Sequence, residues 1–326
     1  MFNTKYNIFK NKNTKVWDEL VNNSPQGCIF NQIEYLDIIG EKYHLWLIEQ
    51  GEEIKAGICL VVSEDEKKII HSDFVIYSGI IFNDLKNTKI SKKRHQEFQI
   101  TEFVVKEISK KYETINFSLS PFIYDIRAFQ WFNFGVKNKR KFSIGIKYTS
   151  ILDISEFNDE NFVEDKSKLF LNLDPVRRYS IREARKEGAE VLQTNSNKLL
   201  IDFYSKMMTK KNFKPNKKKM NSLAKISSLC IQKRKGAIFE ILNKKKNILY
   251  TAFYVWDNNM AYYLFGAGGN VTTSWQSSLI HWEVFKFLAY EKKITRVDLE
   301  GVNSPKRGWF KLTFGGSLKT YFNISY

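Results

Sequence analysis

Near the end of the chain, the segment SPKRGWFKLTFGG (304–316) places a lysine among aromatic residues. Lys311 directly follows Phe310 in this segment. A cation that points into a site could stabilise negative charge that develops during a reaction. The alternative is a solvated lysine between core aromatics, and the residues alone favour that alternative. Lys306 and Arg307 are candidates for contact with solvent or with phosphate.

A second group of candidates consists of three arginines at helical spacing. Arg178, Arg182 and Arg185 recur at steps of four and three, so they share one face of a helix. Guanidinium groups spaced in this way could bind phosphate oxygens, of a tRNA or of a nucleotide diphosphate. The alternative is a basic solvated face that pairs with Glu183 and Glu187. The sequence leaves the two interpretations balanced.

A glycine cluster could bind phosphate through the backbone. Gly266, Gly268 and Gly269 stand between an expected strand and an expected helix. Backbone amides in such a loop, together with the helix N-terminus, can hold a diphosphate. The alternative is an ordinary turn between strand and helix, which is slightly favoured here.

The histidines and cysteines indicate neither a metal site nor a catalytic triad. The four histidines are scattered without ligand spacing, and the three cysteines are widely separated. These cysteines fit a reducing compartment better than a disulfide framework. His281 lies on the helix expected after the glycines, where a buried core position is the better interpretation. No metal site is predicted.

The composition limits the partners without choosing among them. Lys and Arg number 52 against 35 acidic residues, which gives a net charge of +17. This balance suggests a polyanionic partner such as RNA, a nucleotide-linked substrate or anionic lipid. The alternative is compositional drift in a chain rich in Lys, Asn, Ile and Phe, whose lysines are simply solvated. No DNA partner is predicted.

No segment indicates membrane insertion or secretion. No apolar run approaches the roughly 18 residues that span a bilayer, and the polar start of the chain lacks the apolar core of a signal peptide. We therefore expect a cytoplasmic protein without a transmembrane segment. Peripheral contact with the inner face of the membrane stays open.

Two stretches of the chain show the same order of elements: three strands, a helix, a strand, a helix and a strand. In the first stretch these are expected at 43–50, 54–62, 74–82, 92–111, 114–120, 123–132 and 147–154. In the second they are expected at 236–242, 247–256, 260–266, 275–289, 295–301, 304–314 and 318–325. Between the stretches, one helix is expected to begin at Asp174-Pro175 and end at Gly188, and another covers 198–212.

This plan resembles that of the GNAT acyltransferases, and two such units in tandem resemble the Fem family of aminoacyltransferases. The resemblance rests on a strand ending in Asp or Glu-Gly, then a Phe-Lys pair, then Phe-Gly-Gly. In this chain the motif consists of Asp298, Gly301, Phe310, Lys311, Phe314, Gly315 and Gly316. The rest of the resemblance is architectural and covers most of the chain. One departure is the lack of sustained heptads, because Fem enzymes acting on lipid-linked precursors often carry a coiled-coil arm.

The resemblance implies a reaction and roles for particular residues. Fem enzymes transfer an aminoacyl group from aminoacyl-tRNA to an amine of a nucleotide- or lipid-linked muropeptide. Lys311 would lie near the reactive end of the donor, with Phe310 packed beside it to exclude water. The first unit would bind the acceptor through Tyr124, Asp125 and Arg127, where Asp125 could hold the amine and Arg127 a carboxylate or phosphate. The alternative for these three residues is a helix cap and a surface ion pair.

The glycine cluster bears on the identity of the donor. It resembles the loop with which GNAT enzymes hold the diphosphate of CoA, but the usual leading Gln or Arg is missing from LFGAGGNVTTSW (264–275). This departure weakens the case for acyl-CoA and favours aminoacyl-tRNA as the donor.

The sequence therefore predicts an α+β fold of tandem GNAT-like units, with mixed sheets flanked by helices. The first unit is expected over 1–155, with the C-terminal strand able to return to it, and the second over 156–326. The predicted activity transfers an aminoacyl or acyl group to an amine of a cell-envelope or polysaccharide precursor, without a tightly bound cofactor. Two alternatives stay open: an acyl-CoA-dependent N-acetyltransferase of a sugar amine, and a non-catalytic RNA- or nucleotide-binding protein on the same scaffold.

Overall fold

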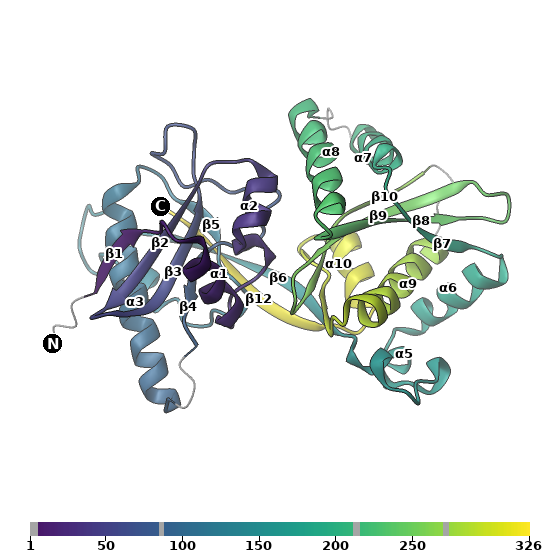
Figure 1. Ribbon diagram of the computed structural model, residues 1–326, viewed down its shortest axis with the longest axis horizontal. Coiled ribbons are helices and arrows are strands. Elements are labelled where there is room, and N and C mark those ends of the chain that lie inside the picture. The colour runs from purple at the N-terminus through teal and green to yellow at the C-terminus, as the bar shows by residue number, and fades with distance from the viewer. Residues whose placement is uncertain (1–5, 85–87, 211–215, 270–273) are drawn as a thin grey trace. The chain divides into compact units, whose positions relative to one another are not determined.

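The computed structural model describes residues 6–84, 88–210, 216–269 and 274–326 (Figure 1). The chain forms two compact units, Met1–Lys147 with Thr320–Tyr326, and Tyr148–Lys319. The C-terminal residues therefore belong to the first unit, although they follow the whole of the second in sequence.

The first unit is built on a four-stranded antiparallel sheet in the order β1-β2-β3-β4. These strands are β1 (Asn7–Lys10), β2 (Tyr43–Gln50), β3 (Glu53–Val61) and β4 (Gly79–Phe82). Its helices are α1 (Thr14–Asn23), α2 (Ile33–Ile39), α3 (Ile90–Lys111) and α4 (Arg127–Trp131). The end of β12 (Ser317–Ser325) pairs antiparallel with β5 (Asn116–Ser118), which brings the C-terminus into this unit.

The two faces of the first sheet are covered by different helices because side chains alternate along a strand. On β3, Ala56 and Ile58 belong to the buried cluster that includes the apolar side of α3. Gly57 points the other way, where a Cβ atom would come within 2.7 Å of Trp17 and Leu20 on α1. The glycine therefore lets α1 pack directly against the strand.

The second unit is built on a mixed sheet in the order β6-β11-β10-β9-β8-β7. Its strands are β6 (Ser143–Asp153), β7 (Glu190–Thr194), β8 (Gly236–Leu242), β9 (Ile248–Trp256), β10 (Ala261–Gly268) and β11 (Arg296–Asp298). Its helices are α5 (Lys168–Leu171), α6 (Pro175–Lys186), α7 (Lys198–Lys210), α8 (Lys217–Gln232), α9 (Ser274–Lys292) and α10 (Pro305–Leu312). Strands β10 and β11 pair in parallel, and the other adjacent pairs are antiparallel.

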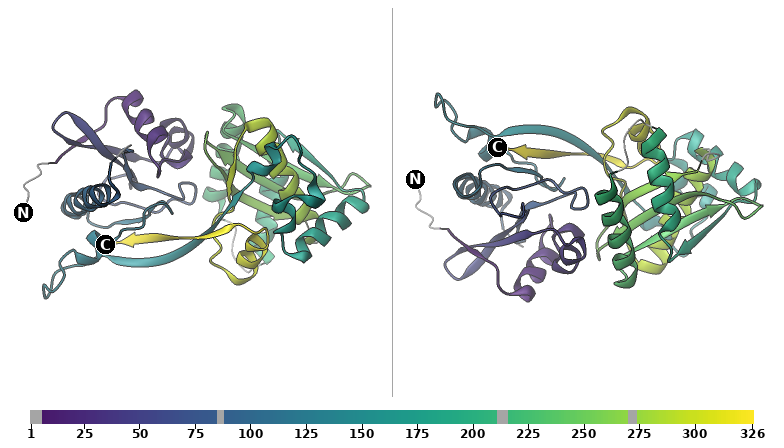
Figure 2. Two further views of the ribbon diagram at one scale, coloured as in Figure 1. Left: turned by 90° about the horizontal axis from the view of Figure 1, so that it is seen from below. Right: turned by 90° about the horizontal axis from the view of Figure 1, so that it is seen from above.

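Helices cover both faces of the second sheet. Helices α7 and α8 pack on one face. Helix α9 packs on the other face, between the sheet and α6 (Figures 1 and 2). Because α9 lies between the sheet and α6, it is apolar around most of its circumference, with Leu279, Ile280, Trp282, Phe285 and Leu288 all buried. The helix is thus buried on more than one face, as its place between two layers requires.

The signals at the ends of α6 act as the sequence indicated. The Asp174 carboxylate accepts a hydrogen bond of 2.9 Å from the backbone N–H of Val176, and Pro175 occupies the first helical turn. Gly188 follows the helix with a φ of 72°, a conformation that glycine adopts without steric cost. Both predicted ends of this helix are confirmed.

Other predicted boundaries need correction. β4 begins at Gly79 rather than at 74, and α4 begins at Arg127 rather than at 123. β10 continues to Gly268, so Gly266 and Gly268 lie in a strand and not in a loop. Strand β7 and helix α8 were not predicted at all.

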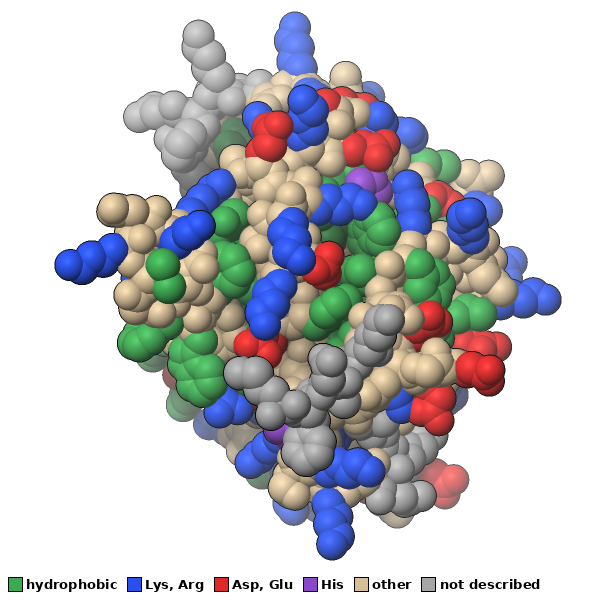
Figure 3. All heavy atoms as spheres, turned by 90° about the vertical axis from the view of Figure 1, so that its left-hand side faces the viewer, with side chains coloured by type: hydrophobic (Ala, Val, Ile, Leu, Met, Phe, Trp, Pro, Cys, Tyr) green, Lys and Arg blue, Asp and Glu red, His purple; other side chains and the backbone are tan. Residues whose placement is uncertain are grey.

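The positive charge is not concentrated on the face that Figure 3 shows. Lys and Arg side chains are spread across this face and are interspersed with acidic ones. On this face, the distribution is that of a solvated basic surface rather than of one basic patch.

Candidate active site

The centre of the second unit is a point where two neighbouring strands separate. β10 and β11 pair only at Ala261 with Val297 and at Tyr262 with Asp298. The chain after β11 follows β6 instead, because the backbone N–H of Leu299 donates to the Ser150 carbonyl at 2.9 Å. The next residue, Glu300, therefore has backbone groups that β10 does not pair.

Side chains satisfy the backbone of Glu300. Its N–H donates to the Asp298 carboxylate at 2.7 Å, and its carbonyl oxygen accepts from the Lys311 ammonium at 3.3 Å. Thr149 donates a further hydrogen bond to the same Asp298 oxygen. The predicted residue Lys311 is thus fixed at the strand separation, and α10 holds it there.

Burial controls the charge of Lys311. Loss of solvation lowers the pKa of its ammonium to about 8, although the carboxyl groups of Glu300 and Asp298 oppose this effect. The Lys311 nitrogen also lies 5.1 Å from the centre of the Tyr263 ring. At neutral pH the group is therefore a partly desolvated cation, which is suited to stabilising a developing negative charge.

An aromatic wall runs from Tyr263, beside this cation, through His281 to Phe310. The Phe310 ring lies 5.6 Å from the His281 ring and 5.4 Å from the Phe314 ring, measured between centroids. The Arg177 guanidinium lies 4.7 Å from the centre of the Phe310 ring. Phe310 therefore packs among the rings of His281 and Phe314 and the guanidinium of Arg177. Its predicted role in excluding water from Lys311 stays a prediction.

His281 is a buried core residue, as the sequence indicated. Its Nδ1 shares a hydrogen bond with the hydroxyl of Tyr254. Burial, together with the nearby charges of Lys311 and Arg177, lowers the pKa of His281 to about 3, so the imidazole is neutral at ordinary pH. A neutral ring can pack among aromatics without the cost of a buried charge.

Gly266 makes room for two tyrosine hydroxyls. The hydroxyl oxygens of Tyr250 and Tyr263 lie 2.7 Å apart. A Cβ atom at position 266 would come within 2.1 Å of the Tyr263 oxygen and 2.6 Å of the Tyr250 oxygen. This glycine therefore shapes the wall beside Lys311. Phosphate binding by Gly266, Gly268 and Gly269 stays a prediction, and residues 270–273 of the expected loop lie outside the described residues.

Arg177 is a site residue that the sequence analysis missed. Its side chain is buried, and Nη1 donates a hydrogen bond of 2.6 Å to the hydroxyl of Ser278 on α9. Within the described part of the chain, no carboxylate forms an ion pair with it. A signal was present, because Arg177 precedes the buried Ile181 and Ala184 by four and seven residues and so shares the inner face of α6.

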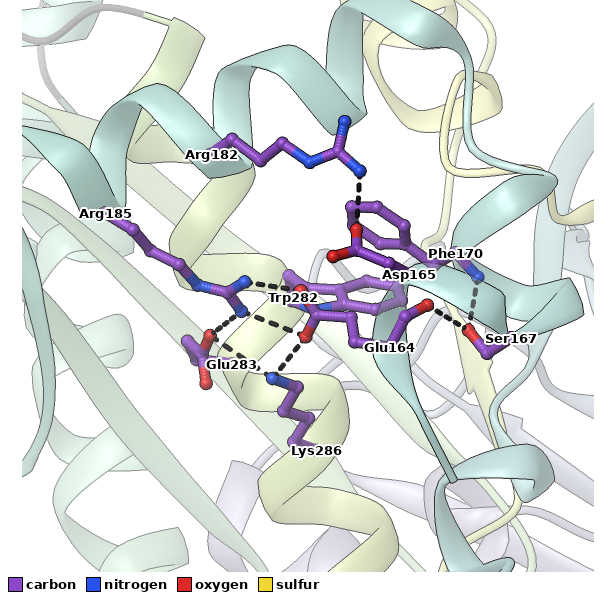
Figure 4. Close-up of polar contacts among 9 residues, drawn as sticks. All are labelled: Glu164, Asp165, Ser167, Phe170, Arg182, Arg185, Trp282, Glu283 and Lys286. Atoms are coloured by element: carbon purple, nitrogen blue, oxygen red, sulfur yellow. Dashed lines mark hydrogen bonds and ion pairs between the residues drawn. The ribbon is translucent and has the colours of Figure 1, made fainter. Parts of the chain in front are cut away.

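The three arginines singled out from the sequence contact other protein groups. Arg178 donates to the Leu171 carbonyl at 2.6 Å. Arg182 pairs with Asp165, and Arg185 pairs with both Glu164 and Glu283 (Figure 4). The expected partners Glu183 and Glu187 are thus replaced by carboxylates from other elements.

Glu164 joins this network together. Burial alone would raise the pKa of its carboxyl, but hydrogen bonds from Arg185, Lys286 and Trp282 outweigh it and lower the pKa to about 2 (Figure 4). A phosphate that bound Arg185 would have to compete with two carboxylates. Phosphate binding by Arg178, Arg182 and Arg185 stays a prediction.

We expect Glu164→Gln to destabilise the second unit by about 1–3 kcal/mol at pH 7, because it weakens charge-assisted hydrogen bonds to partly buried donors. A carboxylate with a lowered pKa stabilises the fold above its ordinary pKa near 4.5 and loses this contribution as the pH falls toward 2. The difference from the wild type should therefore shrink between pH 7 and pH 3 in thermal unfolding. Glu160→Gln, at an exposed position, is the control. Equal midpoints for Glu164→Gln and wild type at pH 7 would contradict a structural role.

The first unit contains a separate pocket of about 750 Å³. The start of α3, the segment 122–127 and Pro25-Gln26 line it, and its charged residues are Lys93, Arg94, Glu97, Asp125 and Arg127. The volume lies in the range of small-molecule sites. Tyr124, Asp125 and Arg127, which the sequence analysis grouped as acceptor-binding residues, all line this one pocket.

Asp125 and Arg127 are held together within the pocket wall. Arg127 donates through Nε at 2.9 Å and through Nη2 at 2.6 Å to the two oxygens of Asp125, and this pairing lowers the pKa of the Asp125 carboxyl. The guanidinium also lies 4.9 Å from the centre of the Phe98 ring. Glu97 differs, because burial raises the pKa of its carboxyl and Asp125 adds to the effect. The pocket thus offers a fixed ion pair and one carboxyl that binds a proton more readily than an ordinary glutamate does.

Comparison with solved structures shows which fold this is. FemX matches with a TM-score of 0.65 at 10% sequence identity, over 97% of this chain and 96% of that one. The chain has the fold of FemX. A tandem GNAT protein from the clavulanic acid biosynthesis pathway matches with a TM-score of 0.54 at 7% identity, over 99% and 98% of the two chains. L-PGS from Bacillus licheniformis matches with a TM-score of 0.52 at 11% identity, over 97% and 92%. The predicted fold class, tandem GNAT-like units in the Fem arrangement, is confirmed.

The likeness to FemX is one of structure and not of sequence. No protein-family model matches the chain, and no curated protein is similar to it in sequence. Among the described residues, no helix is both long enough and apolar enough to cross a membrane. Activity must therefore be argued from the site itself.

Proposed function

We propose that this protein is an N-acyltransferase that moves an aminoacyl or acyl group from an activated donor to an amine of a cell-envelope or polysaccharide precursor. The observation that carries the proposal is the position of Lys311. Its ammonium is fixed where β10 and β11 separate, and Phe310 directly precedes it in α10. This is the pair that the resemblance to Fem enzymes singles out.

The chemistry follows from the charge of this site. Attack of an amine on an ester carbon forms a C–N bond and places negative charge on the carbonyl oxygen. The Lys311 ammonium stabilises that oxygen, and the apolar rings around it strengthen the interaction by keeping water away. Collapse of the intermediate breaks the bond to the donor alcohol and leaves an amide. The nucleophile is the substrate amine, so the protein supplies position and electrostatic stabilisation.

We favour aminoacyl-tRNA as the donor. The lack of a leading Gln or Arg before the glycine cluster weakens the case for CoA, and a net charge of +17 suits a polyanionic donor. Thermal shift measurements separate the candidates. Stabilisation by tRNA but not by CoA supports the proposal, whereas stabilisation by CoA alone would select an acyl-CoA-dependent N-acetyltransferase of a sugar amine. The transfer would take place in the cytoplasm, at the inner face of the membrane where the acceptor is lipid-linked.

We assign the acceptor to the pocket of the first unit. Its cations could hold a phosphate or carboxylate of the precursor, while Glu97 and Asp125 could hold its amine.

Replacing Lys93 and Arg94 together by Gln should raise the KM for the acceptor about 10- to 100-fold, because two charge-assisted contacts are lost. The neighbouring exposed Lys92→Gln is the matched control. A rise in the KM for the donor instead would place the donor in this pocket.

One experiment tests the activity directly. Purified protein is incubated with charged tRNA or acyl-CoA and a panel of nucleotide-linked amine acceptors, and the products are analysed by mass spectrometry. An acceptor whose mass increases by one acyl group supports the proposal. Tight binding of tRNA without transfer to any acceptor would instead support a non-catalytic RNA-binding protein, which the net charge of +17 would also suit.

A further inference from the structure

Glu300 combines features that packing alone does not explain. Its backbone φ is 55°, in the left-handed region that a glutamate enters at a cost of about 1–2 kcal/mol. The side chain is only 7% exposed. Its Oε1 atom is buried and has no hydrogen-bond partner among the described residues. Both the backbone and the carboxyl group are therefore held in unfavourable states.

Such costs are retained where a site needs them. Strained backbone and unpaired buried polar groups are concentrated at functional sites, and an observed outlier is a reason to ask what the residue does. Glycine would adopt this positive φ without strain, but the glycine of this segment stands one position later, at 301. The strained position itself carries a glutamate side chain. Because Glu300 lies beside Lys311, we ask whether it takes part in the same reaction.

Glu300 and Lys311 are close without being paired. The Lys311 nitrogen contacts the backbone carbonyl of Glu300, and the two ionisable groups influence each other electrostatically. Within the described part of the chain, however, the carboxyl and the ammonium do not form an ion pair. The Oε1 atom of Glu300 therefore has no hydrogen-bond partner among the described residues, and it belongs to the same site as the ammonium that we propose acts at the reacting centre.

The geometry points to Glu300 as the acid–base residue that relays a proton from the attacking nitrogen to the leaving atom of the donor. The inference rests on the proposed function. When the C–N bond forms, the nitrogen loses a proton to the Glu300 carboxylate. When the bond from carbon to the leaving oxygen breaks, the carboxyl returns that proton to the oxygen. The products are an amide and a free hydroxyl group, and Glu300 ends in its starting state.

The surroundings suit a carboxyl that must both accept and donate a proton. Burial raises the pKa of Glu300 well above its usual value, and Asp298 on β11 raises it further, while Lys311 on α10 acts in the opposite direction. A general acid–base group works best with a pKa near the operating pH. Neighbouring groups whose pKa values are displaced in opposite directions, as for Glu300 and Lys311, are typical of divided catalytic roles.

Glu300→Gln tests the relay through two independent measurements. First, a carboxyl with a raised pKa costs stability above its unfolded-state pKa near 4.5, so the variant should unfold about 2–4 °C higher than wild type at pH 8 and at the same temperature at pH 4. Second, turnover should fall at least about 100-fold with the KM of each substrate within threefold, because proton transfer and not binding is lost. Exposed Glu291→Gln is the control for both measurements.

Each outcome decides something different. A Glu300→Gln variant that unfolds at a lower temperature than wild type at pH 8 would show that the carboxylate is a structural partner of Lys311, and would overturn the relay. Turnover within threefold of wild type would also overturn it. If wild-type protein transfers no acyl group to any acceptor, the proposed function itself fails, and the relay fails with it.

Discussion

Lys311→Met should abolish most of the transferase activity, with turnover lowered about 100- to 1,000-fold. Methionine keeps the length and the apolar stem of the lysine but removes the charge that faces the oxyanion. Donor binding should change little, because the donor is held mainly by contacts away from the reacting carbon. Single-turnover kinetics and a separate binding titration with the donor distinguish the two effects.

Folding is not expected to explain the loss in Lys311→Met. The lowered pKa of Lys311 means that burial of its ammonium costs stability below pH 8. Removing this cost offsets the lost hydrogen bond to the Glu300 carbonyl, so methionine should leave the midpoint of thermal unfolding nearly unchanged at pH 7. Lys306→Met is the matched control, since Lys306 lies exposed on the same helix. Near-normal turnover in Lys311→Met would rule out the electrostatic role, and an equal loss in Lys306→Met would point to helix α10 as a whole.

The second large effect is the dependence of turnover on pH. Lys311 is cationic below its pKa of about 8 and neutral above it. Turnover should therefore fall about tenfold for each pH unit above 8, because only the ammonium stabilises the oxyanion. Measuring turnover between pH 6 and pH 10 at saturating donor and acceptor tests this.

The Lys311→Arg variant distinguishes the titration of Lys311 from the titration of other groups. A guanidinium stays charged throughout this range, so whatever activity the variant retains should not decline in the same way above pH 8. Deprotonation of the acceptor amine raises turnover with pH, which is the opposite direction. An alkaline decline that persists unchanged in Lys311→Arg would assign the titration to another group.

The strands were predictable where their apolar residues alternate locally. The predicted ranges for β2 and β8 agree with the structure to the residue. The strand predicted at 74–82 was too long, because Phe74, Val75 and Tyr77 are buried without belonging to a strand. Burial requires apolar side chains in any backbone conformation, and composition does not reveal whether a neighbouring strand is present. Helix α8 was missed because a run of lysines at its start is equally typical of an exposed loop.

The site was predictable in part. The Phe-Lys pair could be recognised from residue order, because α10 keeps both residues within one helical turn. The role assigned to Glu300 could not be recognised in this way. Glu300 has a positive φ and an unpaired oxygen at the point where β11 leaves β10, after Asp298. This separation depends on how β6, β10 and β11 pair, which residue order does not reveal. Arg177 shows the opposite case, since helical spacing already placed it on the buried face.

The return of the C-terminus to the first unit sets an order for folding during synthesis. A ribosome completes the sheet of β1 to β4 early, but β5 finds β12 only after the whole of the second unit has been translated. Tyr326 exchanges backbone hydrogen bonds with Ile115, a separation of more than two hundred residues. Contacts between such distant residues form late and slowly. The unit that begins first is thus completed only after the second, and a chain that lacks residues 320–326 leaves the first unit without the strand that pairs with β5.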